Sequence, residues 1–216
     1  MQARARILII IAVAFLVGGL AGGLWWATSQ PPRIKLDLPG LQVLDEAVAL
    51  PDFTLTDHNG APFTAANLRG AWTLLFFGYG HCPDVCPSAL AAVKQALRDL
   101  KEPKTRFVFV SVDPRRDTPA TLKDHVTFVD PAFVGVTGPE AAQKPLWDAL
   151  GIMVEYEDSA RGEPIRDPTQ LSAEAGYLVQ HTASLFFVDP DGQLVAYLLP
   201  PQTPQAIRQV LEQLAR

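Results

Sequence analysis

Two cysteines, Cys82 and Cys86, are the residues whose type and spacing most clearly indicate chemistry in this chain. They are the only cysteines among 216 residues, and three residues separate them. The run Trp72 to Phe77 before them predicts a buried strand, and the run after Pro87 predicts a helix. Paired thiols on a strand-to-helix turn can form a redox pair, bind a soft metal ion, or do both in sequence. The residues alone leave these uses open.

The position of the pair favours the thiolate form of the sulfurs. The amino end of a helix carries a partial positive charge, which lowers the pKa of a nearby thiol. A thiolate is both the stronger nucleophile and the form that binds a metal ion. A purely structural disulfide explains the pair poorly, because a bridge over so few residues restrains little of the unfolded chain.

Composition and charge describe one globular domain of ordinary size with appendages. Hydrophobic residues make up 48% of the chain and charged residues 19%, and the formal net charge is -5. Phosphate binding needs a basic face, so we expect no nucleic-acid partner.

An uncharged stretch near the N-terminus predicts a membrane anchor. Residues 7–27 carry no charge, and about twenty residues are needed to cross a bilayer core. Because Arg4 and Arg6 precede this stretch, the positive-inside rule places residues 1–6 in the cytoplasm and the rest of the chain outside it. We therefore expect one transmembrane helix in an inner membrane, with the C-terminal domain in the periplasm. A signal peptide cleaved near Ala27 is the alternative.

The remaining chain is expected to form a linker and one folded domain. Prolines such as Pro39 predict an extended spacer over residues 28–47. Residues 48–216 are then expected to form the domain. Alternating apolar patterns separated by turn residues predict its elements. Strands are expected at 53–56, 62–64, 72–77, 105–112, 133–137, 152–157, 177–188 and 193–199, and helices at 88–101, 118–128, 139–150 and 204–216.

This order of strands and helices predicts an α/β fold with a mixed central sheet. A thioredoxin-like architecture has the same order, with its reactive cysteines on the turn after the first central strand. Pro87 suits the first position of the helix after the cysteines. Residues 158–176 form a long polar loop of a kind that is often functional.

Two thiolates leave a metal ion under-coordinated, so a third ligand is expected elsewhere. Among the four histidines, His58 lies in a hairpin turn, His125 is expected on a helix surface, and His81 should point away from Cys82. His181 follows the long polar loop and begins an apolar strand. In a thioredoxin-like topology that strand start lies beside the cysteine turn, so His181 is the candidate third ligand.

Three separate segments of the sequence resemble the SCO/SenC family. They are Phe77–Pro87, Ser111–Pro119 and His181–Ser184, in the order in which the family carries its signatures. Members are membrane-anchored, thioredoxin-like copper chaperones for cytochrome c oxidase assembly. The similarity covers about residues 50–216. The family often has an acidic residue just before the histidine, whereas this chain has Gln180.

The resemblance implies a copper site and a set of partners. Cys82, Cys86 and His181 would bind copper, and the two cysteines would also form a redox-active disulfide. Two soft thiolates and one imidazole suit Cu(I), although Cu(II) is also considered. Copper would pass from an upstream carrier to the binuclear copper site of cytochrome c oxidase subunit II. A thiol reductant would keep the pair reduced.

The alternative function is a membrane-tethered thiol-disulfide oxidoreductase, or a thiol peroxidase that attacks with Cys82. Thioredoxin-type enzymes carry a cis-proline at the strand start that faces the cysteines, whereas this chain has Gln180-His181-Thr182-Ala183 there. We therefore expect a metallochaperone rather than an enzyme, with accessory disulfide chemistry left open.

Two aspartates near the motifs have two interpretations. Asp84 and Asp113 could shape the electric field of the site or contact a partner. They could equally be turn residues, since both lie in sequences typical of turns.

Overall fold

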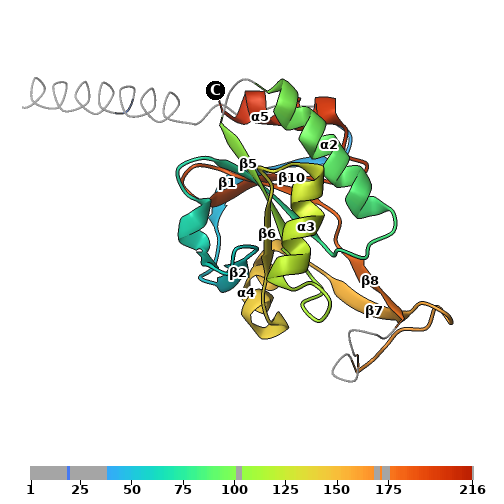
Figure 1. Ribbon diagram of the computed structural model, residues 1–216. Coiled ribbons are helices and arrows are strands. Elements are labelled where there is room, and N and C mark those ends of the chain that lie inside the picture. The colour runs from blue at the N-terminus through green and yellow to red at the C-terminus, as the bar shows by residue number, and fades with distance from the viewer. Residues whose placement is uncertain (1–18, 20–37, 101–103, 168–170, 172–175, 216) are drawn as a thin grey trace, which may run out of the picture. The chain divides into compact units, whose positions relative to one another are not determined.

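The computed structural model describes residues 19, 38–100, 104–167, 171 and 176–215 (Figure 1). Apart from Gly19, the expected cytoplasmic tail and membrane anchor lie outside these residues. No helix in the described ranges is long and apolar enough to cross a membrane. The chain divides into two compact units, Met1–Lys35 and Leu36–Arg216. The second unit is the folded domain described below.

The domain alternates strands and helices as the sequence predicts, with one short 3-10 helix, η1. The elements are β1 (Leu41–Ala49), β2 (Thr54–Asp57), β3 (Pro62–Thr64), η1 (Ala65–Leu68), β4 (Trp72–Gly78), α2 (Val85–Asp99), β5 (Thr105–Ser111), α3 (Pro119–Val129), β6 (Val134–Thr137), α4 (Glu140–Leu150), β7 (Val154–Asp158), β8 (Tyr177–His181), β9 (Leu185–Val188), β10 (Gln193–Leu198) and α5 (Pro204–Leu214).

An eight-stranded mixed sheet organises the domain in the order β1-β10-β9-β4-β5-β6-β2-β3. The neighbours β4, β5 and β6 are parallel, and the other pairs are antiparallel. Every residue of β4 is buried, as expected of a central strand covered on both faces. The mixed central sheet predicted from the sequence is therefore confirmed.

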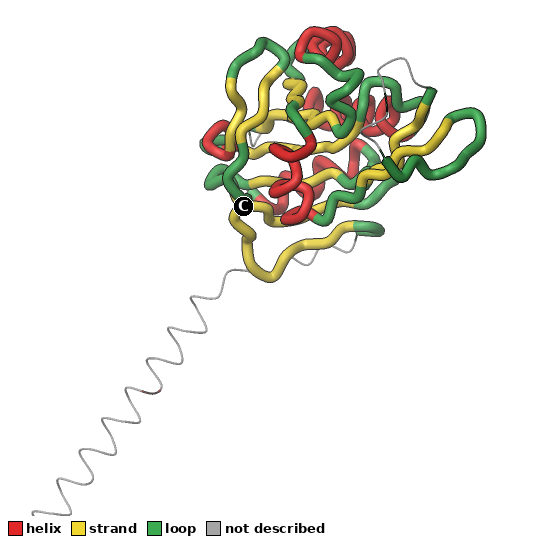
Figure 2. The backbone as a smooth tube through the Cα atoms, turned by 90° about the horizontal axis from the view of Figure 1, so that it is seen from below, coloured by secondary structure: helices red, strands yellow, loops and turns green. Residues whose placement is uncertain are grey.

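The helices start where the sequence provides caps. Thr118 and Thr203 each accept a hydrogen bond from the backbone N–H three residues later, and a proline follows each of them. Helix α3 packs on β6, where Leu122 lies so close to Gly135 that a Cβ there would be 3.1 Å from the leucine Cβ. Helix α2 packs beside α5 and α3. Figure 2 shows the helices in red and the strands in yellow.

Helix α2 begins earlier than predicted. It starts at Val85, so Pro87 occupies its third position rather than its first. A proline is tolerated there because the first N–H groups of a helix have no partner within the helix. Cys86 consequently lies inside the first turn of α2, and only Cys82 lies on the preceding loop.

The predicted strand over 177–188 is in fact two strands that belong to different sheets. β9 pairs with β4 and β10 in the central sheet, whereas β8 pairs with β7 in a separate two-stranded sheet. Between β8 and β9, Thr182 is still hydrogen-bonded to Met153, just before β7, and not to the described strands of the central sheet. Its N–H donates to the Met153 carbonyl, and its hydroxyl accepts from the Met153 N–H. Figure 1 shows the β7–β8 hairpin projecting from the central sheet.

The folded part begins before the boundary predicted at residue 48. Residues 41–49 form β1, which pairs antiparallel with β10 at the edge of the sheet. The expected linker over 28–47 is therefore wrong for its last residues. Most side chains of β1 are exposed, because the strand covers only an edge. Their weak apolar pattern explains why the sequence suggested a spacer.

The stability of the domain is expected to depend on the aromatic side chains that are buried against the central sheet. Phe187 in β9 has no exposed surface, whereas Phe128 on α3 is 91% exposed. We expect Phe187→Ala to lower the free energy of unfolding by about 3–5 kcal/mol, because it leaves a cavity. The matched Phe128→Ala should change it by less than about 0.5 kcal/mol. Urea unfolding of both variants tests this, and equal losses would contradict the packing described here.

Candidate metal centre

The loop that carries Cys82 is held by backbone contacts at the end of β4. The Gly78 carbonyl accepts from the Val112 N–H at 2.8 Å, and the Tyr79 carbonyl accepts from the Cys82 N–H at 3.1 Å. A Cβ on Gly78 would lie 2.8 Å from Cys86 Sγ, closer than such atoms can approach. Glycine at this position therefore allows α2 to bring Cys86 against the end of β4.

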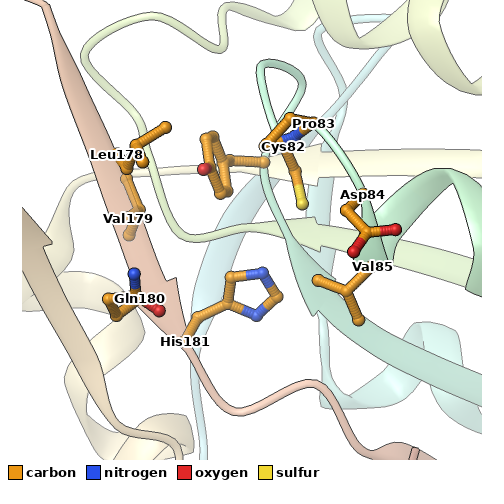
Figure 3. A pocket seen from close by; sticks show the side chains of 9 residues that line it. Cys82, Pro83, Asp84, Val85, Leu178, Val179, Gln180 and His181 are labelled. Carbon is orange, nitrogen blue, oxygen red and sulfur yellow. The ribbon is translucent and has the colours of Figure 1, made fainter. Parts of the chain in front are cut away.

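The fold brings together the three predicted ligands. One donor atom from each of Cys82, Cys86 and His181 lies within 4.8 Å of the others. Cys86 Sγ is 3.6 Å from His181 Nε2, and Cys82 Sγ accepts from the Cys86 N–H at 3.4 Å. Both cysteines are free thiols. Figure 3 shows the imidazole of His181 projecting from β8 towards the loop that carries Cys82.

The imidazole of His181 is oriented by its surroundings. Its Nδ1 lies 3.2 Å from the Thr182 carbonyl. A carbonyl can only accept, so this contact requires the proton on Nδ1 and leaves the lone pair of Nε2 facing Cys86. The rings of Tyr79 and Phe76 pack edge-on at centroid distances of 5.8 and 6.3 Å. This tautomer and orientation are those that a metal-binding histidine requires.

The two thiols differ in burial and in acidity. Cys86 has no exposed surface, whereas Cys82 keeps 9%. The hydrogen bond from Cys86, assisted by the N–H groups at the start of α2, lowers the pKa of Cys82 to about 4. The same hydrogen bond and burial raise the pKa of Cys86. Cys82 is therefore the thiolate of the pair, and Cys86 is its buried proton donor.

A cavity of about 300 Å³ opens beside the three residues. Figure 3 shows its two walls. Cys82 and the next three residues form one wall, and the last four residues of β8 form the other: Cys82, Pro83, Asp84, Val85, Leu178, Val179, Gln180 and His181. Tyr79 also lines the cavity. Cys82 is thus the sulfur that an incoming ligand can reach.

The two aspartates singled out from the sequence have different positions. Asp84 is exposed on the wall of the cavity and makes no side-chain capping bond at the start of α2. Asp113 is fully buried and pairs with Arg116 at 2.5 Å. It also accepts from the Tyr177 hydroxyl at 2.7 Å. Asp113 therefore makes a structural contact with β8, while its effect on the electric field of the site stays a prediction.

The other histidines do not belong to the three-residue cluster. His58 accepts a hydrogen bond from the Gly135 N–H at 3.1 Å, which supports the pairing of β2 with β6. His81 is exposed. His125 was expected on the surface, but its ring is partly buried 5.5 Å from that of Phe109, and burial lowers its pKa. That expectation is wrong. It was based on the charged residues beside His125, but α3 packs on the sheet closely enough to bury part of the His125 ring.

Sequence reasoning missed four residues that support the centre. Tyr79 is buried, and its ring packs on that of His181. Arg116, Asp117 and Tyr177 connect the cysteine loop with the strand of His181. Arg116 and Asp117 lie within the segment Ser111–Pro119 that carries the family resemblance, so that segment was the available signal. Gln180 faces solvent, and its amide donates to Glu157 across the hairpin at 3.3 Å.

The donor set suits a soft, low-coordinate metal ion. Two soft thiolate sulfurs favour Cu(I), and an imidazole nitrogen, which also suits copper, completes a three-coordinate site. A structural zinc site would use four protein ligands. Within the described part of the chain, the cluster contains no fourth cysteine, histidine or carboxylate. The residues therefore fit copper better than zinc.

Comparison with known proteins agrees with this site. The SCO1/SenC family model matches residues 43–216. The chain belongs to the SCO1/SenC family. This membership covers nearly all of the domain, including β2 to α5 and all three residues of the candidate centre.

Individual family members resemble the chain over most of its length. The mitochondrial SCO2 homologue of Bos taurus is 32% identical over 199 residues, which are 90% of this chain and 69% of that protein. The copper-bound ScoI structure of Bradyrhizobium japonicum is 34% identical, covers 76% of this chain and 98% of its own, and has a TM-score of 0.63. The copper-bound ScoI structure of Arabidopsis thaliana is 26% identical, covers 78% and 99%, and has a TM-score of 0.66. These matches confirm the predicted α/β, thioredoxin-like architecture.

The acidity of Cys82 predicts an unusual pH dependence of alkylation. A free cysteine thiol has a pKa near 8.5, so its reaction with iodoacetamide slows about tenfold per pH unit below that value. Because the pKa of Cys82 is about 4, its alkylation rate should stay nearly constant from pH 8 to about pH 5. It should fall only as the pH passes through about 4.

Site-resolved mass spectrometry measures this rate for each cysteine of the metal-free protein. Buried Cys86 is the internal control and should remain unmodified in the folded state. A Cys82 rate that falls steadily from pH 8 downward, or faster reaction at Cys86, would contradict the assignment.

Proposed function

We propose that this protein is a membrane-anchored copper-binding protein that delivers copper to the binuclear copper site of cytochrome c oxidase subunit II. The observation that carries the proposal is the convergence of two thiols and one oriented imidazole within 4.8 Å beside an open cavity. Sco structures similar to this chain, from Bradyrhizobium japonicum and Arabidopsis thaliana, have copper bound.

The geometry suits transfer by ligand exchange. Cys86 approaches the site from the interior, whereas Cys82 and His181 line the cavity. A thiol or imidazole of a partner can enter the cavity and replace Cys82 while the other two donors still bind the ion. Such an exchange avoids releasing free copper, and it needs no catalytic turnover. Cu(I) is the cargo that the soft donors favour, and Cu(II) is the second form to consider.

The N-terminal sequence and the family membership support a location and a set of partners. Residues 7–27 would anchor the chain in an inner membrane, and the copper-binding domain would face the periplasm. An upstream copper carrier would load the site. Because a Cys82–Cys86 disulfide cannot bind copper, a thiol reductant would keep the pair reduced in this oxidising compartment.

Removal of the imidazole provides the main test. We expect the reduced domain to bind one equivalent of Cu(I), and His181→Ala to bind it at least about 100-fold more weakly. Loss of a residue that only orients a ligand already costs 10–100-fold in metal affinity. Competition with a chromophoric Cu(I) chelator measures both dissociation constants.

The matched control for this test is His81→Ala, which removes an exposed histidine next to Cys82. It should bind as tightly as the wild type. A wild-type domain without Cu(I) affinity would refute the proposed function, and unchanged binding by His181→Ala would remove His181 from the ligand set.

A second function, thiol-disulfide exchange with a partner, is favoured by the asymmetry of the two thiols. The Cys82 thiolate would attack one sulfur of a partner disulfide, forming a mixed disulfide and releasing the other partner sulfur as a thiolate. Cys86 would give its proton to that thiolate and attack Cys82 Sγ. The second partner sulfur would leave as a thiolate and take a proton from water, so that the partner becomes a dithiol and the chain holds the Cys82–Cys86 disulfide. The two electrons come from this chain's own thiols.

Removal of the second thiol should stop this reaction at the mixed disulfide. We expect Cys86→Ser to accumulate a covalent adduct with a peptide disulfide that models the oxidised partner site, because no thiol resolves it. Cys82→Ser should form no adduct, since the remaining thiol is fully buried and burial alone raises its pKa. Non-reducing mass spectrometry detects the adduct. Equal adduct formation by both variants would argue against ordered attack by Cys82.

A further inference from the structure

Five consecutive residues after β5 contact both halves of the candidate metal centre. We call residues 113–117 the support loop. On one side it bonds to the loop that carries Cys82, and on the other side to the hairpin that carries His181. It lies in a segment that supplies none of the three candidate ligands.

Asp117 forms the contact with the cysteine side. Its carboxylate is 2% exposed, and Oδ2 accepts from the Gly80 N–H at 2.9 Å and from the Ser111 hydroxyl at 2.5 Å. Gly80 precedes Cys82 by two residues. A Cβ at Gly80 would lie 2.9 Å from Asp117 Oδ1, so the carboxylate packs directly against the backbone of the cysteine loop.

Arg116 forms the contact with the histidine side. Its Nε donates to Asp113 at 2.5 Å, and its Nη1 donates to the Tyr177 carbonyl at 3.0 Å. The guanidinium lies 3.7 Å from the centroid of the Tyr177 ring and 5.6 Å from that of the Tyr79 ring. The Tyr177 hydroxyl completes the arrangement by donating to Asp113 at 2.7 Å.

The hairpin needs this contact because the central sheet does not hold it. Within the described part of the chain, β8 pairs only with β7, and neither strand belongs to the eight-stranded sheet. Tyr177 and His181 lie on the same inward face of β8, since side chains alternate along a strand. Arg116 therefore contacts β8 at its first residue, Tyr177, on the same face as the imidazole of its last residue, His181.

Arg115 joins the other strand of the hairpin to the body of the domain. Its guanidinium pairs with Glu140 at the start of α4. It also donates to the Tyr156 hydroxyl at 3.1 Å and lies 5.3 Å from the centroid of that ring. Tyr156 and Tyr177 pack at a centroid distance of 5.7 Å. Neighbouring residues of one loop thus hold both strands.

We propose that Arg116 is a positioning residue that sets the distance between His181 and the two sulfurs, and that Asp117 independently positions the cysteine loop. The inference rests on copper binding as the proposed function. Arg116 acts on affinity only through His181, whereas Asp117 acts through the cysteines.

Only arginine can make the contacts of residue 116. Its planar fork bonds Asp113 and the Tyr177 carbonyl at once while its face covers two aromatic rings. A lysine keeps the charge but loses the fixed fork. Arg116→Lys therefore separates charge from geometry. Tyr177→Phe removes only the hydroxyl bond to Asp113, and it tests the same contact more gently.

A thermodynamic cycle tests the proposal. Cu(I) affinity is measured for Arg116→Lys and Asp117→Asn, each alone and combined with His181→Ala. We expect Arg116→Lys to weaken binding about 10–100-fold with His181 present, and less than about twofold when His181 is absent. Asp117→Asn should weaken binding by a similar factor in both backgrounds, because its effect passes through the sulfurs.

The matched control is Arg106→Lys, which alters an arginine that also donates to distant carbonyls, those of Asn67 and Arg69. It should leave Cu(I) affinity unchanged. Equal losses for Arg116→Lys with and without His181 would overturn the proposal, as would a matching loss in the control.

Hydrogen exchange of the metal-free protein gives an independent readout. Amides of residues 177–181 should exchange faster in Arg116→Lys than in the wild type, while those of β4 and β5 stay protected. Unchanged exchange in β8 would overturn the proposal even if copper binding holds. If the wild type bound no copper, the proposed function would fail, and exchange in β8 would still decide the positioning role. Tyr177→Phe replaces Arg116→Lys in both experiments should the latter not fold.

Discussion

The approach of Cys86 Sγ to His181 Nε2, at 3.6 Å, is the contact on which the candidate site depends. It joins residues 95 positions apart in the sequence. The sulfur is placed by a fully buried strand and the first turn of a helix, and both are rigid parts of the central fold. The imidazole comes from a hairpin outside the central sheet. The metal centre is thus assembled from one rigid half and one half that is held mainly by polar and aromatic contacts.

The inequality of the two thiols explains how one motif can serve two chemistries. A buried thiol that donates to an accessible thiolate keeps one sulfur reactive at neutral pH. That sulfur can bind a metal ion or attack a disulfide. The two uses exclude each other at any moment, because oxidation of the pair removes both thiolate ligands. The redox state of the two cysteines would therefore decide the state of the protein. The reduced thiols could bind copper, and the disulfide would be the product of an exchange with a partner.

The support loop shows why a motif near a site need not contribute to it directly. Asp113 looked like a candidate for shaping the electric field of the site, yet its carboxylate is neutralised by Arg116 and bonded to Tyr177. Its effect on the centre passes through the placement of β8. Buried charges of this kind are costly unless paired and hydrogen-bonded. The cluster of Asp113, Arg116 and Tyr177 meets that condition by linking segments that would otherwise be held only loosely.

Sequence alone predicted the α/β fold, the strand before Cys82, the helix after it and the choice of His181, because these depend on local patterns and on one family resemblance. It misjudged β1, the break between β8 and β9, and the burial of His125, since each depends on which strand or helix lies opposite. The sequence patterns also did not reveal how Tyr79, Arg116 and Asp117 contact the site. Hydrogen bonds between segments 37 and 61 residues apart leave no periodic trace in the chain. Only the tertiary structure could therefore decide how the histidine is held against the sulfurs.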